Sequence, residues 1–189
     1  MGAPAIIPEQ KPDPSLGEVG KAYPKLVQYL PQVTVQRGKP EPNDNRQLEF
    51  YPPWESRNPN PGKITIEMYR DFHGPERTNA IAGDLLHYIG ARNPSTKQPI
   101  DPKYWAMKQQ VVKSRTPEQK YLDDRLYEEA KRRGESRSFE DWMQESRADA
   151  YIRGWITPDQ ADEWRKHGFY STPAMKKSVE TIKQYLKSK

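Results

Sequence analysis

The sequence predicts a mainly α-helical protein, an irregular bundle of about six short helices with one strand, preceded by a long extended proline-rich arm. Three observations support this fold class. Twelve of the 19 prolines lie within residues 1–62. Helix start and stop residues recur between residues 74 and 186. Hydrophobic residues make up only 33% of the 189-residue chain, against ~45–50% in typical globular domains, so only a modest core is expected.

Residues 1–62 are predicted to form one unit, the extended arm. Each proline fixes its own φ, lacks a backbone donor and disfavours helix in the residue before it. Only the stretch Ala22 to Leu30 leaves room for a helix longer than about two turns. Val33–Val35 and Leu48–Tyr51 are candidate short strands, but the prolines around them argue against a broad central sheet.

The arm is too apolar to be a solvated linker, since a spacer would consist mostly of Gly, Ser and Pro. Apolar side chains spaced along an extended backbone suit docking on another surface, and proline lowers the entropy lost on docking. Two alternatives remain open: the arm wraps its own helical domain, or it is disordered. The predicted partner-binding residues are Ile6, Ile7, Tyr23, Leu26, Leu30, Phe50, Tyr51 and Trp54.

Residues 63–189 are predicted to form a small helical domain. Its first element is a strand, because Ile64 to Tyr69 alternates and is β-branched. Six helices follow, several of which begin with Asp-Pro or Thr-Pro and end at glycine. They are expected to open at Gly74-Pro75, Asp101-Pro102, Thr116-Pro117, Ser138, Thr157-Pro158 and Thr172-Pro173.

The charge pattern and composition limit the classes of partner that the protein could bind. Formal net charge is +5, and residues 1–62 balance seven basic against seven acidic side chains, so the excess lies in residues 63–189. The absence of cysteine excludes disulfides and thiolate metal sites, and no apolar run approaches the ~18–20 residues of a membrane span. DNA is a candidate partner, and the alternative is an ordinary solvated helix face. The candidate contacts are Lys103, Lys108, Lys113, Arg115, Lys176 and Lys177.

One group of residues has the chemistry of a hydrolase. Gly83-Asp84-Leu85-Leu86-His87 follows the strand that carries Glu67, but a zincin helix needs two histidines four residues apart with Glu after the first. If the protein were an enzyme, Glu67, Asp84 and His87 would be catalytic, and His87, Asp84 and His73 would bind the metal. The alternative is that Asp84 and His87 serve only the fold. No Gly-x-Ser-x-Gly elbow and no glycine-rich phosphate loop is present.

Two stretches carry a resemblance to known proteins. Lys63 to Gly90 (Lys-Ile-Thr-Ile-Glu-Met-Tyr through Ala-Ile-Ala-Gly-Asp-Leu-Leu-His-Tyr-Ile-Gly) and Ser138 to Trp155, followed by Glu163-Trp164-Arg165 and Gly168 to Pro173, resemble small virion-associated proteins of tailed bacteriophages. The strand and the His-bearing helix are also similar to the zincin segment of large phage polyvalent proteins, whose two-histidine motif is broken here at Gly83 and Asp84.

The resemblance implies a structural protein of a phage head, connector or tail. We therefore expect a non-enzymatic assembly protein without a cofactor, located in the virion and, during assembly, in the host cytoplasm. Its expected partners are portal, connector or capsid-type subunits, or its own copies, with DNA as an alternative and no membrane. The competing hypotheses are the metal-dependent hydrolase and a DNA-contacting virion protein.

Overall fold

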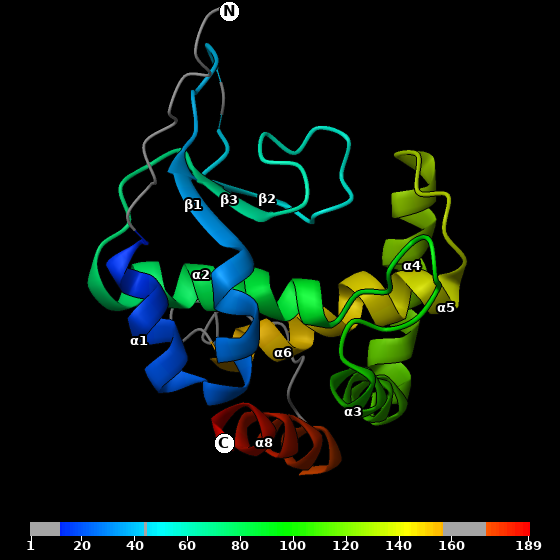
Figure 1. Ribbon diagram of the computed structural model, residues 1–189. Helices are drawn as coiled ribbons and strands as arrows, with labels where there is room; N and C mark the ends of the chain where they lie inside the picture. The colour runs from blue at the N-terminus through cyan, green and yellow to red at the C-terminus, as the bar shows by residue number, and fades with distance from the viewer. Residues whose placement is uncertain (1–11, 44, 157–172) are drawn as a thin grey trace, which may run out of the picture.

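The computed structural model describes residues 12–43, 45–156 and 173–189 and is mainly helical, as predicted, with one small sheet (Figure 1). Long helix α2 (Gly74–Ile89) lies between the sheet and α6 (Ala148–Ile156). At the opposite end from the sheet lies α8 (Pro173–Lys187), beside α3 (Pro102–Lys113). No helix in these described ranges is long and apolar enough to cross a membrane.

The predicted helices after residue 74 form where their end signals stand. Asp101 caps α3 by accepting a hydrogen bond from the Tyr104 amide. Thr116 and Gln119 form a reciprocal capping box at the start of α4 (Pro117–Arg132). Ser138 caps a helix that runs through α5 (Phe139–Trp142), the π-helical turn η2 (Met143–Arg147) and α6. The helix predicted to open at Thr157 lies outside the described residues.

The described part of the predicted arm differs from an extended strap. It contains α1 (Pro14–Ala22) and the 3-10 helix η1 (Pro24–Gln32), followed by β1 (Val33–Arg37) and β2 (Leu48–Tyr51). Pro14 does not prevent a helix because it occupies the first turn, where its missing N–H has no helical partner to lose. Asp13 caps α1 by accepting from the Ser15 amide. Pro24 occupies the first turn of η1, and Pro31 lies inside it.

Three strands form, one at the predicted strand and two at the candidate strands of the arm. The central strand β3 (Ile64–Met68) pairs in parallel with β1 and antiparallel with β2, which gives the order β1-β3-β2. Val33 pairs with Ile64, and Phe50 pairs with Ile66. The prolines of this region do not interrupt the pairing of the strands, because the nearest ones lie before β1 and after β2, outside the paired residues.

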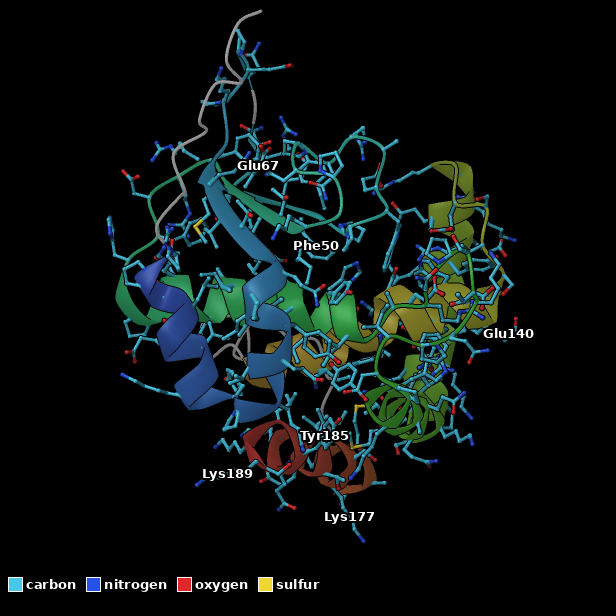
Figure 2. All side chains as sticks on the ribbon, viewed as in Figure 1. Phe50, Glu67, Glu140, Lys177, Tyr185 and Lys189 are labelled. Carbon is cyan, nitrogen blue, oxygen red and sulfur yellow. The ribbon has the colours of Figure 1, made fainter. Side chains whose placement is uncertain are left out.

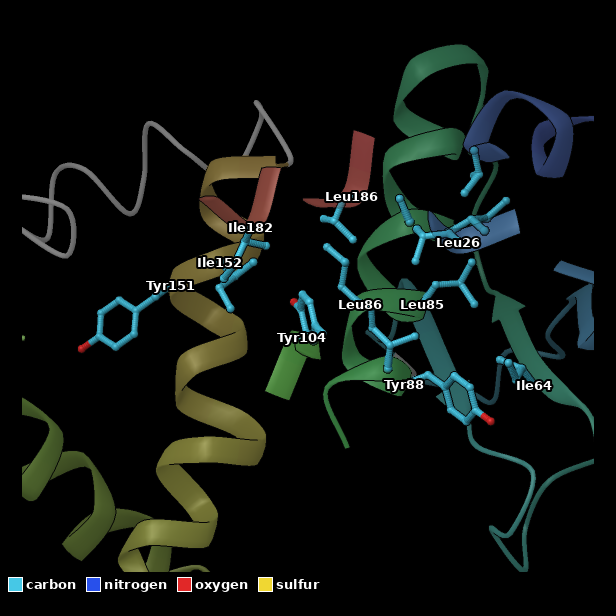
Figure 3. Packing of buried hydrophobic residues seen from close by; sticks show 14 of the residues in the cluster. Leu26, Ile64, Leu85, Leu86, Tyr88, Tyr104, Tyr151, Ile152, Ile182 and Leu186 are labelled. Atoms are coloured by element: carbon cyan, nitrogen blue, oxygen red, sulfur yellow. The ribbon is translucent and has the colours of Figure 1, made fainter. Parts of the chain in front are cut away.

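One core joins the arm to the helical domain. Leu16, Val19 and Leu26 are buried in the same hydrophobic cluster as the α2 and α8 side chains (Figure 3). Asp13 also pairs with Arg77 of α2, and the Lys25 ammonium donates to the Lys189 carbonyl oxygen at 3.1 Å. The described residues of the arm, 12–43 and 45–62, therefore share a core with the helical domain, in agreement with the self-wrapping alternative.

Candidate functional site: a cavity between the sheet and two helices

Glu67, the first predicted catalytic residue, lies away from the other two. Glu67 lies in β3 between the buried residues Ile66 and Met68, and its side chain lies on the outer face of the sheet. Phe50 lies on the opposite face, toward α2 (Figure 2). Its carboxylate accepts from Gln36 at 2.8 Å and from the Tyr69 hydroxyl at 2.8 Å. Because the sheet separates Glu67 from α2, Glu67, Asp84 and His87 do not form one catalytic site.

The predicted metal ligands are also apart. His73 is exposed at the N-cap of α2, and Asp84 comes eleven positions later, about 16 Å along the helix axis at 1.5 Å per residue. Across residues 12–43, 45–156 and 173–189, no group of three or more His, Asp or Glu side chains could hold a metal ion. The three residues that the hydrolase alternative would use to bind a metal, His73, Asp84 and His87, are therefore not brought together as a metal site.

His87 instead takes part in a buried ion group. Its Nδ1 lies 2.7 Å from Oδ2 of Asp149, which is 3% exposed. The other oxygen of Asp149 lies 2.6 Å from the ammonium of Lys108, which is 0% exposed. Lys108 also donates to the Gly90 carbonyl at 3.0 Å. The cation that balances Asp149 is thus a side chain of the protein itself.

Gly90 leaves the room that this ion group needs. A Cβ at this position would lie 2.6 Å from Lys108 Nζ and 3.1 Å from Asp149 Oδ1. Both distances are shorter than ordinary van der Waals contact. The end of α2 can therefore approach α3 and α6 closely only because residue 90 has no side chain.

The exposed edge of His87 lines a cavity of about 520 Å³. The cavity lies where β2 and the segment after it meet the C-terminal end of α2 and the start of the α5–η2 helix. Its walls are formed by Phe50, Pro52, Trp54, Glu55, His87, Tyr88, Ala91, Arg92, Asn93, Pro94, Lys97, Arg137, Asp141 and Glu145. None of these residues is Ser, Thr or Cys, and the one hydroxyl in this wall is the phenol of Tyr88.

Aromatic rings form one wall of the cavity. Trp54 stacks on Tyr88 with ring centroids 5.8 Å apart, and Phe50 meets His87 edge-on at 5.5 Å. Trp54 remains 37% exposed, whereas Tyr88 is 7% exposed. Of the two stacked rings, Trp54 is therefore the one that can still bury area against a partner.

Ion pairs form the opposite wall. Arg92 donates to Asp141 at 2.6 Å and to Glu145 at 3.0 Å. Burial alone would lower the pKa of Arg92, but the hydrogen bonds and charges of Glu145 and Asp141 outweigh it and raise that pKa. Arg137 lies 3.5 Å from Glu145. Together with Lys97 and Glu55, the cavity wall carries three cationic and three anionic side chains besides His87, so it does not select strongly for either charge.

Most of the predicted partner-binding residues serve the protein's own fold. Leu26 is 0% and Tyr51 7% exposed, and Tyr23, Leu30 and Phe50 pack partly buried against the core. Trp54 alone among the described ones is a large exposed hydrophobic residue. Ile6 and Ile7 lie outside the described residues.

Two of the candidate DNA contacts have side chains buried in the protein. Lys108 is buried as described above, and Arg115 has a side chain only 8% exposed that pairs with Asp123 at 2.8 Å. Asp123 is 0% exposed and also accepts from Arg147 at 2.7 Å and from the Tyr151 hydroxyl at 2.8 Å. Sequence reasoning missed both Asp123 and Asp149 as the acceptors of these buried cations. The remaining contacts are exposed: Lys103, Lys113, Lys176 and Lys177.

Comparison of the chain with protein-family models, curated proteins and solved structures gave no match. The cavity and the surface charge are therefore the observations on which a function can be proposed.

Proposed function

We propose that this chain is a non-enzymatic structural or assembly protein of a tailed-phage particle, which docks on a neighbouring subunit of portal, connector or capsid type. Residues 63–90 and 138–155 support the phage assignment through their resemblance to virion-associated proteins. In this proposal the chain acts in the virion and, before that, in the host cytoplasm during assembly.

The observation that supports docking most directly is the aromatic wall around Trp54. Protein interfaces draw most of their binding energy from Trp, Tyr and Arg side chains seated in pockets. Trp54, Tyr88 and Arg92 bring these three residue types together in one cavity of about 520 Å³. A segment of the partner inserted there would cover the exposed face of Trp54 without meeting an excess of one charge.

The side chains with catalytic chemistry favour the same proposal, because they already have partners within the protein. Glu67 is bonded on the far face of the sheet, and Nδ1 of His87 is held by Asp149. Asp149 shares its charge with Lys108. This arrangement orients His87 as part of the cavity wall and leaves the hydrolase hypothesis without a ligand set.

The segment before residue 12 is the second contact in the proposal. Since the described anchors of the arm other than Trp54 are committed to the core, Ile6 and Ile7 are the remaining predicted anchors for a partner.

The test compares how well two alanine variants of the chain are incorporated into phage particles, measured after purification of the particles. Trp54→Ala removes the exposed ring of the cavity, and Tyr121→Ala removes a ring that is 64% exposed on α4 and lines no part of the cavity. Truncation of a hot-spot side chain costs about 2 kcal/mol or more of binding free energy, which should weaken docking by roughly 30-fold. We expect the wild-type chain and Tyr121→Ala in particles at similar copy number and Trp54→Ala strongly depleted.

Circular dichroism and urea unfolding of both variants control for folding. The proposal is wrong in its location if the wild-type chain is absent from particles. It is wrong in its site if folded Trp54→Ala is incorporated as well as the wild type.

A further inference from the structure

The antiparallel helix pair α3 and α8 carries an unusual excess of positive charge. Across their described residues the two helices contain seven lysines and one acidic residue, Glu180. Lys108 is buried on Asp149, so six lysines remain for the outer surface. These six, with Glu180, define the α3–α8 face: Lys103, Lys113, Lys176, Lys177, Lys183 and Lys187.

Two contacts fix the pairing of these helices. Ser114, just after α3, lies 3.2 Å from Ser178 between their hydroxyl oxygens. At the other end, the Tyr185 hydroxyl donates to Asp101 at 2.7 Å. Later residues of α8 therefore meet earlier residues of α3, so the two helices run antiparallel.

The apolar stripe of α8 directs its lysines outward. Met175, Val179, Ile182 and Leu186 are all 0% exposed and repeat at intervals of three and four, so they fill the inner side of the helix. Lys176, Lys177 and Lys187 are exposed, and Lys183 keeps 31% of its side chain exposed. Lys177 projects away from the body of the molecule at the end opposite the sheet (Figure 2).

This face accounts for the charge of the whole chain. Six lysines against Glu180 leave a net charge of +5, which equals the formal net charge of all 189 residues. All other basic and acidic residues therefore cancel. The net charge of the chain is small, but its distribution is strongly uneven. The electrostatic field of a charged surface region influences association with charged partners.

We propose that the α3–α8 face binds the phosphate backbone of double-stranded DNA without sequence preference. Lys103 and Lys113 are ten residues apart, about 15 Å along a helix, a length over which each DNA strand presents four or five phosphates at ~3.4 Å. Lysine ammonium groups on flexible stems can follow such a row without a fixed register.

The surroundings of the lysines favour a duplex over other polyanions. Single-strand binders stack bases on exposed aromatic rings, but Tyr185 is half-buried between the Lys25 and Lys103 ammonium groups, 5.4 and 5.1 Å from its ring centroid. Membrane-surface helices carry exposed large apolar residues, and among the described residues those of this protein are Val27, Trp54 and Tyr121, none of them on α3 or α8.

The test uses two variants of the full chain with the same net charge. The face variant replaces Lys103, Lys113, Lys177 and Lys187 by Gln. The control variant replaces by Gln the residues Lys39, Lys63, Lys120 and Lys131, which are all exposed and lie outside α3 and α8. Fluorescence anisotropy with a 20-bp duplex of mixed sequence measures the affinity between 50 and 200 mM NaCl.

Neutralising four to six phosphates predicts a slope of log K against log salt of about −4 to −5, from roughly −0.9 per phosphate. The face variant should bind at least 10-fold more weakly with a slope nearer −1, and the control should stay within about 3-fold of wild type. Equal losses in both variants, or a salt-independent affinity, would overturn the proposal. So would tighter binding to oligo-dT, to polyglutamate or to vesicles of anionic phospholipid than to the duplex.

Discussion

The ion pair between Lys108 and Asp149 predicts a large loss of stability when the lysine is removed. In Lys108→Met an unbranched apolar side chain, one atom shorter, replaces the lysine, and Asp149, 3% exposed, loses the cation 2.6 Å away. Removing one partner of a buried pair costs about 3–5 kcal/mol, because the other charge stays buried. His87 still contacts Asp149 at 2.7 Å, which places the expected loss toward 3 kcal/mol.

Urea unfolding followed by circular dichroism measures this loss. Lys113→Met is the matched control: it lies on the same helix but is exposed, and such surface changes alter stability by within about 0.5 kcal/mol. The double variant Lys108→Met with Asp149→Asn removes the unpaired charge and should therefore be more stable than Lys108→Met alone. If Lys108→Met unfolds within about 1 kcal/mol of wild type, or if the effects of the two substitutions simply add, the pair does not stabilise the fold as argued.

Two further perturbations test the buried polar groups. Asp123→Ala should lower the free energy of unfolding by about 3–5 kcal/mol, since Arg115 and Arg147 lose the carboxylate that they share, and an unchanged urea midpoint would contradict this. Burial raises the pKa of Tyr29 to about 12, so its neutral form is favoured in the folded state. Stability is then fully present below the ordinary tyrosine pKa of ~10 and falls as pH rises toward 12. Tyr29→Phe should show a smaller loss across that window, and an identical pH profile would refute the assignment.

Helix ends were the most predictable part of the fold, because each depends on a few adjacent residues. Thr116-Pro117 with Gln119 and Asp101-Pro102 mark the starts of α4 and α3 in the structure. The same signal, Asp13-Pro14, starts α1 and was overlooked because the density of prolines suggested an extended chain. A proline in the first turn is compatible with a helix, so the spacing of prolines matters more than their number.

The sheet was less predictable because pairing is not local. β1 finds its parallel partner 31 residues later along the chain, as in Val33 with Ile64. Nothing in the residues 33–37 themselves specifies that register. Residues 33–37 become partly buried only when α2 covers one face of the sheet. Local sequence patterns do not reveal this tertiary packing.

The buried ions left a signal in the sequence. Lys108 lies four residues after Tyr104 and three before Val111, so it shares the buried side of α3. A lysine in the middle of an apolar stripe indicates a buried acidic partner, but the sequence alone does not identify that partner. Asp149, 41 residues away in the chain, is brought there by the packing of α6 against α3.

The docking of α8 sets an order on biosynthesis. Leu26 of η1 and Leu186 of α8 are both 0% exposed in one cluster, and Lys25 bonds the carbonyl of Lys189. A ribosome releases residue 26 long before residue 186 is made, so η1 emerges without its final cover. The nascent chain must therefore keep its early apolar residues from aggregating until α8 has left the exit tunnel. Slowing translation near residue 173 should lengthen that vulnerable interval, which links the yield of this protein to the speed at which its last helix is synthesised.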